Sequence, residues 1–94
     1  MSRSILQNEK VCFVCGTPLN LHRHHVFGGY ANRRLSERWG LWLYLCYEHH
    51  EGNTGVHLNR ELELEVKRFA QAQFEATQGT REDFRRIFGK SYIV

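Results

Sequence analysis

Two short motifs with the same spacing constrain this chain more than any other feature. Cys12 and Cys15 are separated by two residues, and so are Cys46 and His49. Structural zinc is held by cysteine sulfur and histidine nitrogen, and its ligands come in such pairs because one tight turn can aim two side chains at one ion. The four residues therefore predict a closed Cys3His site for a structural Zn²⁺ ion. The alternative is that the cysteines are free and only pack as small apolar side chains.

The size and composition of the chain agree with a metal-stabilised domain. Its 94 residues are enough for one domain with a modest core, which a bound metal would help to hold together. Three cysteines, an odd number, argue against a disulfide framework and for a reducing compartment. The N-terminus is polar, and the longest apolar run, LWLYLCY, is far shorter than the ~20 residues of a membrane helix. We therefore expect a cytoplasmic protein without a membrane segment.

The histidines outnumber what one zinc site can use. Beyond His49 the chain has five more, which are His22, His24, His25, His50 and His57. Adjacent residues of a strand point to opposite faces, so one member of the pair His24 and His25 can bind a metal while the other takes a proton from water. A metal ion and a general base are what phosphodiester hydrolysis needs. The alternative is that these histidines only form hydrogen bonds or serve as additional zinc ligands.

Positive charge is concentrated beside the histidines. The formal net charge is +3, and residues 21–40 contain four arginines against one acid, Glu37. The forked guanidinium group matches phosphate oxygens, and contacts of this kind position a nucleic acid without reading its sequence. The predicted DNA-binding residues are Arg23, Arg33, Arg34 and Arg38.

The pattern of the chain predicts an α+β fold in one domain, residues 1–94. Residues 10–25 are expected to form a β-hairpin, and residues 26–38 a loop around two glycines. The run GLWLYLC predicts a strand, followed by a short helix that begins at Cys46. Together they would form a zinc-stabilised ββα core over residues 11–58.

Residues 59–94 are expected to form a helical tail that covers this core. Asn59 can cap a first helix, whose apolar residues share one face. Thr80 and Asp83 form a capping box for a second helix, and Gly89 is a stop signal.

The combined pattern CxxC, HH, GG and LCxxHH resembles the zinc-knuckle branch of the HNH (ββα-metal, or His-Me finger) endonucleases. The stretch from Leu21 to His57 is further similar to small phage and prophage proteins related to the catalytic domain of RecA-dependent recombination-enhancing nucleases. The resemblance covers residues 11–60, and the tail FGKSYIV is also typical of the phage proteins.

The resemblance implies a ββα-metal core that cleaves DNA phosphodiester bonds with a divalent metal ion. His25 matches the general base of the family, His24 the preceding metal-binding position, and His50 a ligand of the catalytic metal. The resemblance also implies phage or prophage origin. Mg²⁺ is the first expectation for the catalytic ion, with Mn²⁺ or Zn²⁺ as alternatives.

The chain departs from the family pattern at several positions. Leu41 stands where many relatives have asparagine, so Asn32 becomes the candidate for bracing the loop. His57 is either a third ligand of the catalytic metal or a packing or phosphate contact. His22 is expected on the strand face away from the site, or at its periphery.

Two functions from different classes follow. The first is an endonuclease that acts on DNA, with a recombinase filament or a phage packaging protein as a candidate partner. The second is a zinc-stabilised nucleic-acid-binding or adaptor domain without catalysis, which would need neither His25 nor His50. The helical tail, residues 60–94, could also form a dimer or partner interface, so both a monomer and a dimer are compatible with the sequence.

Overall fold

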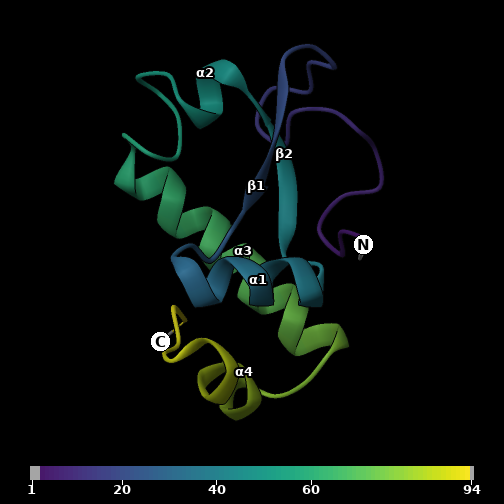
Figure 1. Ribbon diagram of the computed structural model, residues 1–94, viewed down its shortest axis with the longest axis vertical. Helices are drawn as coiled ribbons and strands as arrows, with labels where there is room; N and C mark the ends of the chain where they lie inside the picture. Colours follow the sequence, from purple (N-terminus) through teal and green to yellow (C-terminus); the bar gives the residue numbers. More distant parts are fainter. Residues whose placement is uncertain (1–2, 94) are drawn as a thin grey trace.

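The computed structural model describes residues 3–93 and has an α+β fold, as expected. A two-stranded antiparallel sheet is combined with four helices in these residues (Figure 1). In chain order the elements are β1 Leu21–His25, α1 Tyr30–Trp39, β2 Trp42–Cys46, α2 Tyr47–His50, α3 Arg60–Thr77 and α4 Arg81–Phe88. Within the described part of the chain, no helix has both the length and the apolar character needed to cross a bilayer.

The register of the sheet decides which histidines lie together. His22 pairs with Leu45 and His24 pairs with Leu43, so these four side chains share one face of the sheet. His25 points to the other face, which confirms that the two adjacent histidines face opposite ways. The prediction that His22 points to the opposite face of the strand from the site is wrong, because residues two apart on a strand point to the same side. The alternative, a position at the periphery of the site, is not contradicted.

The predicted hairpin over residues 10–25 is only half present. Its second strand is β1, but residues 11–20 form turns instead of a strand. The backbone N–H of Cys12 donates to Thr17 O at 2.8 Å, and that of Gly16 donates to Cys12 O at 2.8 Å. These local hydrogen bonds fold the chain into turns around the Cys12 sulfur. The backbone groups that form them are not available to pair with a second strand in a hairpin.

The predicted loop over residues 26–38 is wrong for most of its length, because it contains α1. The Gly-Gly pair only precedes this helix: Gly29 is its N-cap residue, with φ +91°. The segment that follows contains good helix formers, and Gly40 ends the helix in the left-handed conformation, with φ +72°. Asn32 is therefore a helix residue, and it donates a hydrogen bond of 3.4 Å to Phe88 O, so it links α1 to the C-terminal end of α4 and braces no loop.

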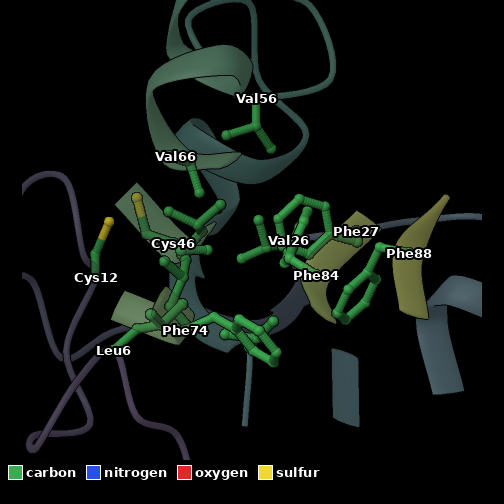
Figure 2. Packing of buried hydrophobic residues seen from close by; sticks show 14 residues of the cluster. Leu6, Cys12, Val26, Phe27, Cys46, Val56, Val66, Phe74, Phe84 and Phe88 are labelled. Carbon is green, nitrogen blue, oxygen red and sulfur yellow. The ribbon is translucent and has the colours of Figure 1, made fainter. Parts of the chain in front are cut away.

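The helical tail forms as predicted and closes one hydrophobic core. Asn59 caps α3 through a bond from Leu62 N, and the capping box of Thr80 and Asp83 begins α4. The core joins both parts of the chain; its buried residues are Leu6, Cys12, Val26, Phe27, Leu41, Leu43, Leu45, Cys46, Val56, Val66, Ala70, Phe74, Phe84 and Phe88. Figure 2 shows Cys12 and Cys46 at one edge of this cluster and the aromatic rings of Phe27, Phe84 and Phe88 at the other.

Ser36→Ala is expected to lower the free energy of unfolding by about 1–3 kcal/mol. The Ser36 side chain is fully buried; its Oγ accepts from Phe27 N at 3.1 Å and donates to Phe27 O at 2.9 Å. Without the hydroxyl, both backbone groups of Phe27 lose this partner. Urea unfolding would measure the change. Thr77→Ala is the control, because the Thr77 hydroxyl donates to Gln73 O on the exposed last turn of α3. Equal effects in the two variants would contradict the prediction.

Candidate metal centres and catalytic cleft

The zinc knuckle, defined as Cys12, Cys15, Cys46 and His49, is brought together as predicted. Cys15 Sγ lies 3.8 Å from Cys46 Sγ, and His49 Nδ1 lies 3.3 Å from Cys46 Sγ and 3.8 Å from Cys12 Sγ. The sulfur separation is far longer than the ~2.05 Å of a disulfide. It equals the edge of about 3.8 Å of a tetrahedron with Zn–S bonds of ~2.3 Å. The four residues are thus positioned to bind a metal ion and are compatible with structural zinc.

The backbone around Cys12 favours the thiolate form of this residue, which is the form that a metal requires. Burial raises the pKa of the Cys12 thiol, but backbone N–H groups, including those of Cys15 and Val14, lower it to about 6. The N–H groups of Val14 and Cys15 lie 3.4 and 3.5 Å from the Cys12 sulfur. Gly16 allows this turn, because its φ of +81° is a conformation that other residues resist. Cys15 itself is exposed, which does not fit cysteines that only pack as apolar side chains.

A second group of possible ligands, the His24 cluster, consists of His24, His50 and His57. One ring nitrogen from each lies within 4.8 Å of the other two, and His50 Nε2 is 3.2 Å from His57 Nε2. The residues come from β1, from α2 and from the loop after α2. The structure thus places His57 beside His24 and His50, and it is His24, not His25, that faces His50.

Two histidines of the His24 cluster have lowered pKa values, which favours the neutral form that binds a cation. Burial, together with the neighbouring imidazoles of His50 and His57, lowers the pKa of His24 to about 3. Burial also lowers the pKa of His50, with His57 acting in the same direction. These two rings are therefore neutral at pH 7, and a neutral imidazole has the lone pair that a metal ion requires.

His25 forms a pair with a carboxylate on the other face of the sheet. Its Nε2 lies 2.9 Å from Glu37 Oε1, and Arg23 Nη1 donates to both oxygens of Glu37 at 2.9 and 3.1 Å. Burial alone would raise the pKa of Glu37, but hydrogen bonds from His25 and Arg23 lower it. An ionised carboxylate can only accept, so Nε2 of His25 has the proton, and in the neutral tautomer of this ring Nδ1 has the lone pair. The pair therefore sets the tautomer of a possible general base.

Glu37 is the residue that the sequence analysis missed. In the sequence, Glu37 is the one acid among the arginines of residues 21–40. That isolation is a usable signal, because a single carboxylate in a basic segment is stabilised by pairing with a cation or an imidazole. Its partner could not be identified from the sequence, because His25 is on β1 and Glu37 is on α1.

A cleft of about 370 Å³ brings the two histidine groups together. Three cationic side chains, Arg23, Arg33 and Lys67, line it beside the histidines. The full set of lining residues is Arg23, His24, His25, Val26, Gly28, Arg33, His50, His57, Glu63 and Lys67. Arg23 also lies over the Trp42 ring, 3.7 Å from its centroid.

Arg34 and Arg38 line a different hollow, beside Tyr30 on α1. Of the four predicted DNA-binding arginines, Arg23 and Arg33 thus reach the cleft.

Comparison of the chain with protein-family models, curated proteins and solved structures returned no match. The resemblance to the HNH endonucleases therefore remains a prediction that rests on the motifs.

Proposed function

We propose that this protein is a metal-dependent endonuclease of the HNH type that hydrolyses DNA phosphodiester bonds. The observation that carries the proposal is the shared cleft: a carboxylate-paired histidine and a cluster of three histidines line it together. β1, β2 and α2 follow in the order of a ββα unit, with α1 inserted between the strands, and α2 contacts both strands. The zinc knuckle would hold β2 and α2 in position against the turn that precedes β1.

Each group has a separate task in this reaction. His25 accepts the proton of the attacking water at Nδ1, while Glu37 keeps the ring in the required tautomer. Arg33 and Lys67 attract the phosphate into the cleft. His24, His50 and His57 would hold the catalytic cation, which supplies stabilisation of the negative charge on the leaving oxygen.

The ligand chemistry favours a different ion from the Mg²⁺ that the family resemblance suggests. The His24 cluster offers three imidazole nitrogens and no carboxylate. Mg²⁺ prefers oxygen ligands and keeps several waters, whereas imidazole suits Zn²⁺, Cu²⁺, Fe²⁺ and Ni²⁺. We therefore propose a transition metal ion as the cofactor, and expect weaker cleavage with Mg²⁺ than with Zn²⁺, Co²⁺ or Ni²⁺.

Plasmid nicking by the purified protein tests this function. Each divalent ion is supplied in turn, with EDTA as the blank, and the His25→Ala variant is run beside the wild type after its knuckle metal content has been verified. Metal-dependent nicking that is lost in the variant would support the nuclease. DNA binding without cleavage under every metal, unchanged by His25→Ala and His50→Ala, would instead favour the adaptor function.

Glu37→Gln is expected to lower kcat by about 100-fold with little change in KM, because the amide can present an N–H to His25 and reverse its tautomer. Steady-state nicking rates over a range of DNA concentrations would measure kcat and KM.

Arg23→Gln is the matched control for Glu37→Gln, since it breaks the same ion pair but keeps the contact between His25 and Glu37. It is expected to raise KM and leave kcat within a few-fold of the wild type. An equal fall in kcat in both variants would mean that the ion pair serves only to hold the structure.

A further inference from the structure

The ring of His50 faces a second group of possible ligands through its other nitrogen. His22 Nδ1 lies 2.9 Å from His50 Nδ1, and Glu51 Oε1 lies 3.2 Å from the same nitrogen. Donor atoms from these three residues all lie within 4.8 Å of one another. We name this group, His22, His50 and Glu51, the His22 cluster. It opens toward solvent through Glu51, whose side chain is 48% exposed, whereas the side chain of His50 is 15% exposed.

The spacing of these atoms is close to that of ligands on one ion. Metal bonds of 2.0–2.1 Å to nitrogen and oxygen give a tetrahedral edge of about 3.3 Å. The 3.2 Å separation between His50 and Glu51 has this length, and the 2.9 Å separation between His22 and His50 is a few tenths shorter. Two imidazoles and one carboxylate are also a common ligand set of zinc sites that keep an open position.

His50 cannot serve both clusters at once in its neutral form. Its Nε2 lies 3.2 Å from His57 Nε2 in the His24 cluster, and its Nδ1 faces His22 and Glu51. A neutral imidazole has one lone pair and one N–H, so only one of its nitrogens can bind a metal. An ion on one side therefore turns the proton of His50 toward the other side.

We propose that His22, His50 and Glu51 form a further site for a borderline divalent cation such as Zn²⁺ or Co²⁺. This site alternates with the His24 cluster, because both need the single lone pair of His50. When an ion is bound in the His22 cluster, Nε2 of His50 on the cleft side has the proton and cannot bind a second ion. The metal-binding claim stands apart from the proposed cleavage activity, since it concerns occupancy alone.

Co²⁺ binding to a set of variants tests the site. Co²⁺ in the knuckle absorbs through sulfur-to-metal charge transfer, whereas Co²⁺ on nitrogen and oxygen does not, so spectra and metal analysis together separate the two. The wild type is expected to bind one ion beyond the knuckle ion. The double variant His24→Ala/His57→Ala is expected to keep that additional ion, because the His22 cluster is intact.

A third substitution in the double variant identifies the ligands. Adding His22→Ala is expected to remove the additional ion, whereas adding His25→Ala, a histidine of the same strand outside the cluster, is expected to leave it in place. The site is refuted if the double variant binds only the knuckle ion, or if the additional ion survives His22→Ala. Alternation is refuted if the wild type binds two ions beyond the knuckle ion. In each variant the charge-transfer band of the knuckle verifies the fold.

Discussion

Replacing Cys15 by serine is expected to unfold the protein, although the Cys15 side chain is exposed. Substitutions at exposed positions usually change the free energy of unfolding by less than about 0.5 kcal/mol. A structural Zn²⁺ ion, in contrast, contributes an apparent ~10–16 kcal/mol, which is as large as the ~5–15 kcal/mol stability of a whole domain. Serine does not replace a thiolate as a zinc ligand, so most of that contribution would be lost.

The exposure of Cys15 makes this variant more decisive than one at a buried cysteine. Cys46→Ala should also unfold the protein, but Cys46 belongs to the hydrophobic core, so a cavity would contribute to the loss. Val14→Ser is the matched control, because Val14 is the exposed neighbour of Cys15, and it is expected to stay close to wild-type stability. Circular dichroism and bound zinc would be measured for each variant. A folded, zinc-free Cys15→Ser protein would refute the structural metal site.

Replacing His25 by alanine is expected to reduce DNA cleavage by about 10²–10⁴-fold, the usual contribution of a general base. The knuckle and the His24 cluster would remain, since His25 belongs to neither. The loss should therefore appear in kcat, with bound metal and stability close to those of the wild type. Steady-state nicking at saturating DNA and metal would measure it.

Added imidazole gives this prediction a sharper test. Alanine leaves room beside Glu37, where a free imidazole can bind and accept the proton in place of the missing ring. We expect imidazole to restore part of the rate in His25→Ala, and to restore nothing in His50→Ala, where a metal ligand is missing. Full activity of His25→Ala without imidazole would remove His25 from the mechanism.

The sequence by itself determined the features that depend on short stretches of chain. The zinc knuckle was predictable because each ligand pair lies within one turn, where spacing alone directs both side chains. The helices of the tail were predictable for the same reason: the bonds of Asn59 and Thr80 join residues three apart. Local propensity failed over residues 11–20, where backbone bonds to and around Cys12 prevail over the β-prone side chains. At α1 the interpretation of the two glycines was wrong, because they precede a helix of good helix formers instead of forming a loop.

Only the tertiary structure decided which side chains meet across the chain. Glu37 is 12 residues from His25, His22 is 28 from His50, and Asn32 is 56 from the carbonyl of Phe88. The first two contacts depend on the register of β1 against β2 and on the docking of α1 and α2 against β1. A shift of one residue in that register would exchange the faces of His24 and His25. The local motifs thus supply the residue types that the candidate chemistry needs. The pairing of the two strands determines which histidine faces the carboxylate and which histidines face each other.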